Sequence, residues 1–313
     1  MNRKIIPLFA AVMFRLSAIS IMALVLSAGA VLMPSTARGQ IFVTSFYNST
    51  IGEYATSGDT VNASLVSGLS YPMGIAVSGS DLFVTTGFGV IGEYTTSGTG
   101  VNASLVSGLT DPYGIAVSGS DLFVANENGV IGEYTTSGTT VDASLISGFD
   151  DGATTIAVSG SDLFIANNGS GTIGEYTTSG ATVNGSLVSG LSVPRGIAAS
   201  GSDLFVTNYG GGEGGGTIGE YTMSGAVVNA SLVSGLNYPI CIAVYGSDLF
   251  VLNYWDGTIG EYTTSGDAVN ASLVSGLSYP YGIAVEVPEP ATGLMLLIAG
   301  AALSMRRRRK QLA

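Results

Sequence analysis

Residues 71–109 read YPMGIAVSGSDLFVTTGFGVIGEYTTSGTGVNASLVSGL, and close copies of this stretch fill most of the 313-residue chain. The motif IGEY recurs at intervals of 40 to 45 residues, beginning at Ile51, Ile91, Ile131, Ile173, Ile218 and Ile259. A fixed period of this length is typical of repeat folds, in which each repeat is one supersecondary unit that packs on its neighbours. This stretch therefore decides the fold class.

Each repeat contains four short runs with the composition of β-strands. In the quoted copy they lie at residues 75–77, 82–85, 90–95 and 101–106, where β-branched and aromatic residues dominate and Gly, Ser and Asp separate the runs. Four antiparallel strands in about 40 residues match one blade of a β-propeller, and a single blade cannot bury both of its faces. We therefore predict an all-β, six-bladed β-propeller over residues 40–286, with an open β-solenoid as the alternative.

The order of the runs at the two ends of the repeat region predicts how the ring closes. The region begins with an LFV-type run at residues 41–43 and ends with an IAV-type run at residues 283–285, so each end lacks the run that the other supplies. We expect these two runs to pair in one shared blade, because that pairing removes the free sheet edges. An open solenoid would not need such complementary halves.

Both ends of the chain carry segments typical of export. Residues 1–39 combine Arg3, Lys4 and Arg15 with an apolar run over residues 16–33, which predicts a helical secretory signal peptide cut before Gln40. An uncleaved N-terminal anchor is the alternative. Near the C-terminus, the apolar residues 291–305 predict a short transmembrane helix. Fifteen helical residues reach about 22 Å across a hydrocarbon core of about 30 Å, which suits transient membrane insertion.

The repeat motifs resemble those of two propeller families. Pro72-x-Gly74-Ile75-Ala76-Val77 followed by LFV, together with IGEY followed by Ser-Gly, is similar to the NHL-repeat and the virginiamycin B lyase-like propellers. The second resemblance implies a site that uses histidine and acidic residues near a metal ion.

The C-terminal segment, residues 287–313, resembles the PEP-CTERM sorting signal of Gram-negative bacteria that make exopolysaccharide. It carries the motif Val287, Pro288, Glu289 and Pro290, then the apolar span, then the basic end Arg306, Arg307, Arg308, Arg309 and Lys310. The resemblance implies that an exosortase-type enzyme cuts near the motif and releases the propeller to the envelope, the cell surface or the extracellular matrix. A permanent C-terminal membrane anchor is the alternative.

The charge of the repeat region excludes two classes of partner. Residues 40–286 contain one basic residue, Arg195, and 21 of the 22 acidic residues of the chain, which leaves a formal charge near −20. Nucleic acids and anionic membrane surfaces are bound through Lys and Arg, so we exclude both as partners of this region. A strongly negative surface fits a soluble exported domain.

The composition also limits the chemistry. The chain has no histidine, which excludes histidine general bases and histidine metal ligands. The IAV runs are expected nearest the axis, and they offer no metal ligand there. We therefore predict no catalytic residue and no resident cofactor, with Ca²⁺ at the glutamates of the IGEY motifs as the only candidate ion. A metal-dependent lyase or lactonase-like enzyme with acidic ligands alone is the alternative.

The copies differ from one another on one side only. The turns after the first and third runs are nearly constant (SGSD and Ser-Gly), and both emerge on the same side of an antiparallel blade. The other connections vary and carry the aromatic residues Phe46, Tyr47, Tyr71, Phe88, Tyr113, Tyr209, Tyr238, Tyr254, Trp255, Tyr279 and Tyr281. Binding residues gather on loops held by a rigid scaffold.

From this asymmetry we predict a non-catalytic binding protein that recognises exopolysaccharide or an envelope protein through its variable side. The candidate binding residues are Tyr47, Tyr113, Glu127, Asp151, Arg195, Tyr209, Tyr254, Trp255, Asp256 and Tyr281. A passive structural surface protein, whose loops differ by drift, is the remaining alternative.

Overall fold

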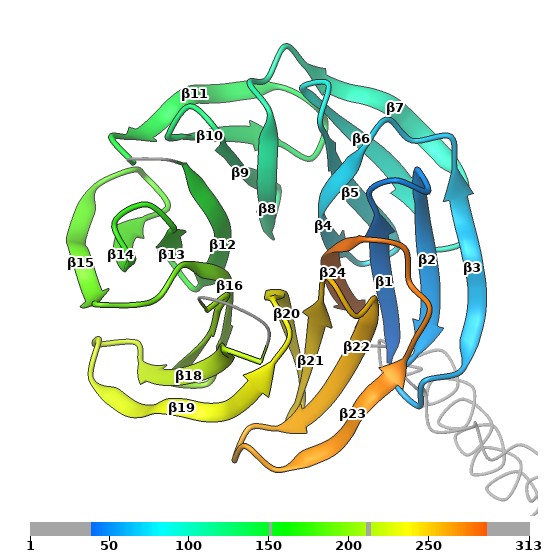
Figure 1. Ribbon diagram of the computed structural model, residues 1–313. Helices are drawn as coiled ribbons and strands as arrows, with labels where there is room; N and C mark the ends of the chain where they lie inside the picture. Colours follow the sequence, from blue (N-terminus) through cyan, green and yellow to red (C-terminus); the bar gives the residue numbers. More distant parts are fainter. Residues whose placement is uncertain (1–38, 150–151, 211–213, 287–313) are drawn as a thin grey trace, which may run out of the picture. The chain divides into compact units, whose positions relative to one another are not determined.

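The computed structural model describes residues 39–149, 152–210 and 214–286, which form a six-bladed β-propeller (Figure 1). The predicted signal peptide and the predicted sorting segment lie outside these residues. Within the three ranges every regular element is a strand. No helix in them has the length and hydropathy of a membrane span.

Each blade is a four-stranded antiparallel sheet. The inner strands are β4 (Pro72–Ser78), β8 (Pro112–Ser118), β12 (Ala153–Ser159), β16 (Pro194–Ser200), β20 (Pro239–Tyr245) and β24 (Pro280–Glu286). The second strands are β5 (Asp81–Thr86), β9 (Asp121–Asn126), β13 (Asp162–Asn167), β17 (Asp203–Asn208), β21 (Asp248–Asn253) and β1 (Gln40–Ser45). The third strands are β6 (Val90–Thr95), β10 (Val130–Thr135), β14 (Thr172–Thr177), β18 (Gly216–Thr222), β22 (Thr258–Thr263) and β2 (Thr50–Ala55). The outer strands are β7 (Gly100–Ser107), β11 (Thr140–Ser147), β15 (Thr182–Ser189), β19 (Val227–Leu236), β23 (Ala268–Val274) and β3 (Thr60–Ser67).

The ring closes as the sequence predicts. The last inner strand, β24, joins the first three strands in one sheet of order β24-β1-β2-β3. We count this sheet as the first blade, so the sheets of inner strands β4, β8, β12, β16 and β20 are the second to the sixth blades. Phe42 of β1 pairs with Ala284 of β24, and Ile41 pairs with Val285. Inner strands contact one another in the circular order β4, β8, β12, β16, β20, β24 and back to β4. The shared blade and the closed ring are thus confirmed, and the open solenoid is wrong.

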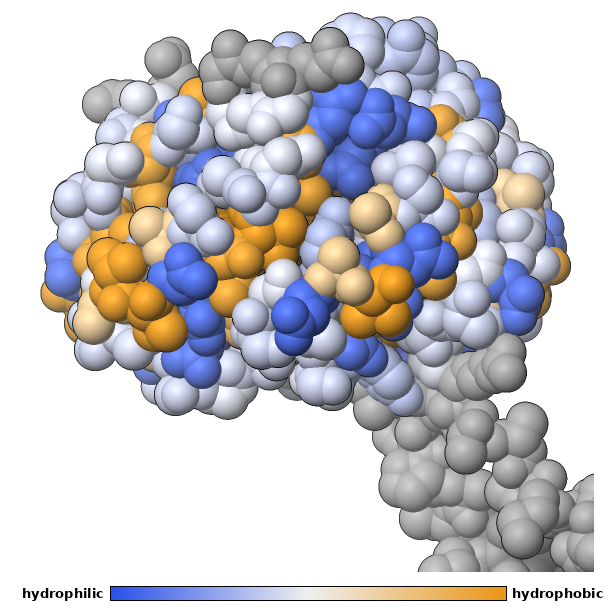
Figure 2. Space-filling model, turned by 60° about the horizontal axis from the view of Figure 1, so that its bottom comes forward, coloured by the Kyte–Doolittle hydropathy of each residue, from blue (hydrophilic) through white to orange (hydrophobic). Residues whose placement is uncertain are grey.

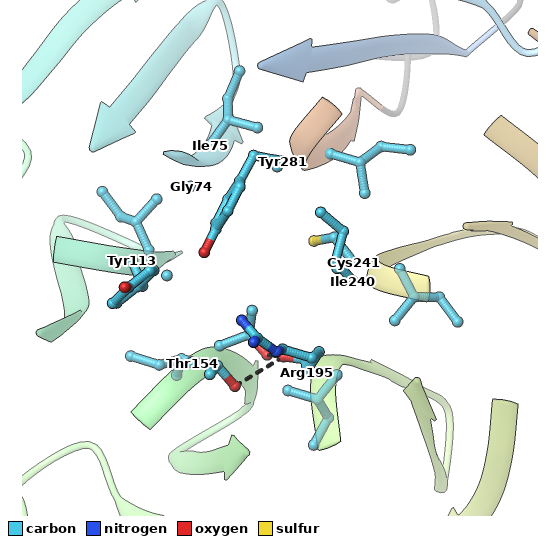
Figure 3. A pocket seen from close by; sticks show the side chains of 16 residues that line it. Gly74, Ile75, Tyr113, Thr154, Arg195, Ile240, Cys241 and Tyr281 are labelled. Carbon is cyan, nitrogen blue, oxygen red and sulfur yellow. Dashed lines mark hydrogen bonds between the residues drawn. The ribbon is translucent and has the colours of Figure 1, made fainter. Parts of the chain in front are cut away.

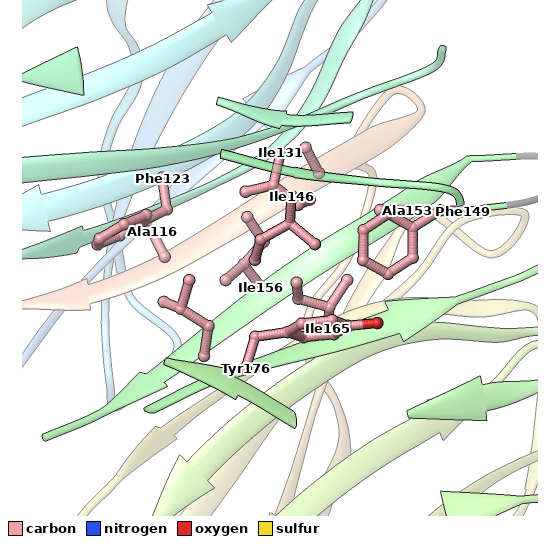
Figure 4. Close-up of a cluster of buried hydrophobic side chains, with 11 residues drawn as sticks. Ala116, Phe123, Ile131, Ile146, Phe149, Ala153, Ile156, Ile165 and Tyr176 are labelled. Carbon is pink, nitrogen blue, oxygen red and sulfur yellow. The ribbon is translucent and has the colours of Figure 1, made fainter. Parts of the chain in front are cut away.

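Apolar faces hold neighbouring blades together. One phenylalanine of each second strand is almost fully buried: Phe42, Phe83, Phe123, Phe164, Phe205 and Phe250. In Figure 4, Phe123 and Ile131 of one blade share a cluster with Ile156 and Ile165 of the next. Truncating a buried phenylalanine to alanine typically costs about 3–5 kcal/mol, so these layers carry much of the stability of the ring.

The predicted two-sided arrangement of the turns is confirmed. The backbone N–H of Thr96, in the turn between β6 and β7, donates a hydrogen bond of 2.8 Å to the carbonyl of Ser80, in the turn between β4 and β5. On the other side, the N–H of Leu109 donates to the carbonyl of Gly89 at 3.0 Å. We call the side of the SGSD and Ser-Gly turns the fixed face, and the opposite side the variable face.

The rim of the propeller is formed by the outer strands. Their exposed valines, at 53–62 % of full exposure, are Val61, Val101, Val141, Val183, Val227, Val228 and Val269. Figure 2, which turns the lower edge of Figure 1 forward, shows hydrophobic residues in separate patches between hydrophilic ones. The apolar surface on this side is therefore divided rather than continuous.

Candidate functional site

The inner strands begin earlier than the sequence predicts, and each contains a β-bulge. The pairing of β4 with β5 shifts register between Pro72 and Ile75, and the other five blades show a register shift in the same region. From sequence, the residues around the proline are expected in the connections, whereas in the structure they belong to the inner strands. A bulge adds a residue to one strand and re-aims the side chains beside it. The residue after the proline consequently faces the propeller axis in several blades.

Neighbouring inner strands approach each other so closely at the bulge that this position of β4 requires a glycine. A Cβ atom on Gly74 would lie 2.3 Å from the carbonyl oxygen of Tyr113 in the next blade, so a side chain has no room there. The Thr85 hydroxyl accepts a hydrogen bond from the Gly74 N–H at 2.9 Å and donates one to the Tyr113 carbonyl at 2.9 Å. One threonine thus fixes the bulge of its own blade and the position of the neighbouring inner strand.

A pocket of about 120 Å³ lies between the inner strands. One isoleucine per blade lines it: Ile75, Ile115, Ile156, Ile197, Ile242 and Ile283. The residues that the bulges turn inward also line it: Tyr113, Thr154, Arg195, Ile240 and Tyr281. The IAV strands are expected to offer apolar side chains at the axis, and the isoleucine layer agrees with this expectation. The second layer, in which all residues except Ile240 carry polar groups, is not expected from the sequence.

Arg195 is the one basic residue among the described residues. Figure 3 shows its guanidinium nitrogens and the Tyr281 hydroxyl directed toward the middle of the pocket. The guanidinium carbon lies 5.2 Å from the ring centre of Tyr209, a cation–π distance. The Arg195 Nε atom is buried and has no hydrogen-bond partner among the described residues. The Thr154 hydroxyl donates to the Arg195 carbonyl at 3.0 Å, so the backbone of Arg195 is fixed although its side chain is not fully satisfied.

Burial raises the pKa of the two tyrosines and the cysteine that line the pocket, so these groups stay protonated near neutral pH. Burial raises the pKa of the Tyr281 phenol far above its ordinary value, although the nearby Arg195 charge lowers it in part. Burial, and then the charge of Glu127, raises the pKa of Tyr113. Burial also raises the pKa of the Cys241 thiol, which lies in the pocket wall. The pocket therefore offers the Arg195 guanidinium and two tyrosine hydroxyls as hydrogen-bond donors. The pKa shifts of Tyr113, Tyr281 and Cys241 all run upward, so none of these three is prepared to act as a general base or a thiolate nucleophile.

The variable face carries one connected cluster of aromatic rings, which we call the aromatic surface. All eleven aromatic residues that the sequence places on this side belong to it, with ring centres 4.7–6.2 Å apart. Phe88, Tyr47 and Trp255 are the most exposed, at 70, 59 and 57 %. Tyr113 and Tyr281 are partly buried in the pocket and join the cluster by stacking at 6.2 Å.

Strained backbone supports three of these rings. Tyr71, Tyr238 and Tyr279, each directly before the proline of an inner strand, have left-handed φ angles of 53°, 54° and 48°. A non-glycine residue in this region costs about 1–3 kcal/mol, and such strain concentrates at functional sites. The equivalent position in the fourth blade is Gly152, with φ 88°, which carries no such cost.

The acidic candidates are spread around the variable face. The backbone N–H of Glu127 bonds to the carbonyl of Asp111 at 3.1 Å, beside the third blade. Asp256 accepts a hydrogen bond from the Asn237 side chain, beside the sixth blade. Asp151 lies outside the described residues. The predicted tyrosines, Trp255 and Arg195 thus lie together, and Asp256 lines a pocket with Tyr254, Trp255 and Tyr279. Glu127 lies near enough to Tyr113 for its charge to raise the pKa of that phenol.

No group of three or more Cys, Asp or Glu side chains converges on a point that could hold a metal ion among the residues described. The IGEY glutamates lie on six separate third strands, one in each blade: Glu53, Glu93, Glu133, Glu175, Glu220 and Glu261. Each is accompanied by at most one or two other carboxylates.

The comparisons with known proteins agree with this architecture. Residues 25–291 match the sequence model of the virginiamycin B lyase family. The chain belongs to this family. Residues 286–310 match the PEP-CTERM protein-sorting motif, which implies export to the cell envelope or surface and processing by an exosortase-type enzyme. No curated protein matches the chain in sequence.

Solved structures share the fold of this virginiamycin B lyase family member at low identity. A propeller in a nidogen/laminin complex has a TM-score of 0.68 at 14 % identity and covers 80 % of this chain and 100 % of its own. A streptogramin B lyase has a TM-score of 0.59 at 21 % identity, with 78 % and 83 % covered. A catalytically inactive histidine-to-alanine variant of virginiamycin B lyase from Staphylococcus aureus, solved with quinupristin, has a TM-score of 0.58 at 20 % identity, with 81 % and 94 % covered.

Proposed function

We propose that this protein is a non-catalytic propeller of the cell surface or extracellular matrix, which binds exopolysaccharide through its aromatic surface. The observation that carries the proposal is the single cluster of eleven rings on one face. Contiguous exposed apolar patches mark binding sites on soluble proteins. The C–H faces of sugar rings are apolar and stack on aromatic rings, while tyrosine hydroxyls supply hydrogen bonds at the edges.

The absence of catalysis rests on the chemistry of the pocket. The Staphylococcus aureus relative is described as catalytically inactive when one histidine is replaced by alanine. This chain contains no histidine at all. Burial raises the pKa of Tyr113, Tyr281 and Cys241, so these groups stay protonated near neutral pH and do not replace a histidine general base. A metal-dependent lyase or lactonase-like activity would require acidic ligands alone.

The proposed route to the surface follows from the sorting motif. In this route the predicted signal peptide starts export, the apolar residues 291–305 insert transiently into the membrane, and an exosortase-type enzyme cuts near Pro288-Glu289-Pro290. Mass spectrometry of the protein isolated from the cell surface tests this step. The expected C-terminus lies at or just after this motif, whereas an intact end at Ala313 would show a permanent anchor.

Binding is tested by titrating the protein with exopolysaccharide purified from the source cells. Trp255 is the one tryptophan of the chain, so its fluorescence reports directly on the aromatic surface. We expect a saturable change, and at least tenfold weaker binding in a Tyr47→Ala/Tyr279→Ala variant that retains Trp255. These two rings lie 4.7 Å apart.

The matched control is Tyr245→Ser, since Tyr245 ends β20 at the fixed face and the corresponding residue of β4 is Ser78. This variant should bind as the wild type does. An unchanged fluorescence with every saccharide fraction would contradict the proposal and favour a passive coat protein. Shortening of the polysaccharide that stops when EDTA is added would favour the enzyme.

A further inference from the structure

We propose that the pocket between the inner strands is a binding site for a single carboxylate group on a short carbon stem, held by Arg195 with the hydroxyls of Tyr113 and Tyr281. This site goes beyond the proposed function, because it lies beneath the aromatic surface and recognises charge rather than a sugar face. It adds a ligand class to the protein whether or not the aromatic surface binds polysaccharide.

The fold does not need a charge at the position of Arg195. The corresponding residue in the other blades is Met73, Tyr113, Thr154, Ile240 or Tyr281, none of them ionised near neutral pH. Removing part of a guanidinium from water is costly unless a partner replaces the water. The buried Nε atom of Arg195 has no partner among the described residues. The unsatisfied donor therefore points to a ligand that the pocket receives.

The hydrogen-bond donors of the pocket match the acceptors of a carboxylate. A guanidinium presents a planar pair of N–H donors, which fits the two oxygens of a carboxylate. The Tyr281 and Tyr113 hydroxyls line the same pocket as Arg195 and remain protonated. An amide of the same shape would place its NH2 group against the guanidinium, which donates only, and would therefore bind more weakly than the acid.

The size and the lining of the pocket restrict the rest of the ligand. An apolar cavity of about 150 Å³ holds one benzene ring, so this pocket of about 120 Å³ holds roughly five non-hydrogen atoms. The rest of a larger acid must lie in the neighbouring pocket, which shares Arg195 and Tyr281. The isoleucine layer favours a short apolar stem next to the carboxylate. The propeller region carries 21 acidic residues and one arginine. Its negative field repels polyanions, so the ligand is limited to one negative charge at the site.

A neighbouring pocket gives the site an opening toward the variable face. Arg195, Tyr209, Ile240, Tyr254 and Tyr281 line it, with a volume of about 180 Å³. Arg195 and Tyr281 line both pockets, so a ligand that enters between the tyrosines reaches the guanidinium. The carboxylate has two possible sources, a free short-chain acid or the acid group of a sugar residue, and the experiment separates them.

Isothermal titration calorimetry with the purified full-length protein provides the test, using butyrate and glucuronate as probes and butyramide and glucose as their neutral counterparts. We expect at least one acid to bind at least tenfold more tightly than its neutral counterpart. Binding by butyrate alone identifies a free acid as the source, and binding by glucuronate alone identifies a sugar acid. Equal binding of acid and neutral probe, or no binding by either acid, overturns the proposal.

Two variants locate the site. Arg195→Met copies the residue of the second blade at the same position, Met73, so the fold accommodates it; affinity for the acid should fall at least tenfold. Arg195→Lys keeps the charge but loses the planar pair of donors, and should retain only part of the affinity. Wild-type affinity in both variants contradicts the proposal. The Tyr47→Ala/Tyr279→Ala variant should still bind the acid, which separates this site from the polysaccharide surface.

Discussion

The two faces of the propeller obey different constraints. On the fixed face each Ser-Gly turn touches the outer strand of the preceding blade: a Cβ atom on Gly98 would lie 2.5 Å from the carbonyl oxygen of Leu65, and one on Gly138 would lie 2.6 Å from that of Leu105. The variable face contains turns of several lengths and an aromatic cluster over part of the ring. The contrast teaches that contact between blades keeps the fixed face constant, whereas loops free of that contact differ and can bind.

Of the changes on the two faces, the largest expected effect comes from disturbing a turn of the fixed face. Gly138→Val places a β-branched residue at φ 87° and puts its Cβ atom against the Leu105 carbonyl. We expect the free energy of unfolding to fall by about 3 kcal/mol, since backbone strain and a steric clash add. For a domain of this size that lowers the Tm by about 6–12 °C. Circular dichroism melting measures the change.

The control for this variant is Gly148→Val on the variable side. Gly148 has φ 96°, but its added Cβ atom meets nothing within 4 Å. In Gly148→Val the free energy of unfolding should fall only by the cost of the left-handed backbone conformation, about 1–2 kcal/mol. Equal losses at the two positions would show that contact between blades does not set the constraint.

The second prediction concerns the carboxylates near the fixed face. Burial, and then the charges of Asp121 and Asp142, raises the pKa of Glu133, and the other IGEY glutamates shift in the same direction. A raised pKa means that the folded state holds protons more tightly than the unfolded state. The contribution of these protons to the free energy of unfolding is complete when the pH is below the pKa of the glutamates in the unfolded chain. It is lost as the pH rises through their higher pKa in the folded protein. The Tm should therefore rise as the pH falls from 8 to 5.

We expect a rise and not a fall, because all six glutamates shift in the same direction. Glu133→Gln removes one repelling charge, so it should raise the Tm at pH 8 and reduce the pH dependence. A Tm that falls steadily from pH 8 to pH 5 would contradict the shift. Gln40 of the first blade occupies the position that Asp81 occupies in the second blade. Its side-chain amide donates a hydrogen bond to Glu53 at 2.7 Å, so this glutamate faces an amide where Glu93 faces a second carboxylate.

The repeat made most of the fold predictable from sequence. The repeat period predicts the number and size of the blades. The incomplete repeats at the two ends predict the shared sheet, in which Ile41 pairs with Val285. The bulge was not predictable, because a register shift breaks the alternation from which strand faces are inferred. For that reason Tyr113, Arg195 and Tyr281 were assigned to the variable loops, although their side chains line the pocket. The contribution of Thr154 and Ile240 was missed altogether.

One signal in the sequence could have located the inner layer. The residue after the proline varies from Met73 to Arg195 between two residues that rarely change, Pro and Gly. A variable position inside a constant motif indicates a side chain with local freedom, which at the axis means a pocket. The contacts among the aromatic residues were beyond sequence reasoning, because they join rings from blades far apart in the chain, such as Tyr47 and Tyr279.

The third prediction concerns strain on the variable face. Val193 has φ 57°, which is unfavourable for a β-branched residue, whereas asparagine tolerates this region. Val193→Asn should raise the free energy of unfolding by about 1 kcal/mol and the Tm by about 2–4 °C. Val183→Asn is the control, since this exposed valine lies in the regular strand β15 and should give no gain. An equal gain at both positions would mean that the strain at Val193 is not the cause.

The smallest expected effect on stability is at the centre of the aromatic surface. Trp255 is 57 % exposed, so Trp255→Ala should change the free energy of unfolding by no more than about 0.5 kcal/mol. Phe164→Ala, at a fully buried position, should cost about 3–5 kcal/mol in the same melting experiment. A large loss at Trp255 would mean that the rings serve as a cover for the blade ends. A negligible loss leaves a large aromatic side chain displayed to solvent without benefit to the fold, which is what a binding surface requires.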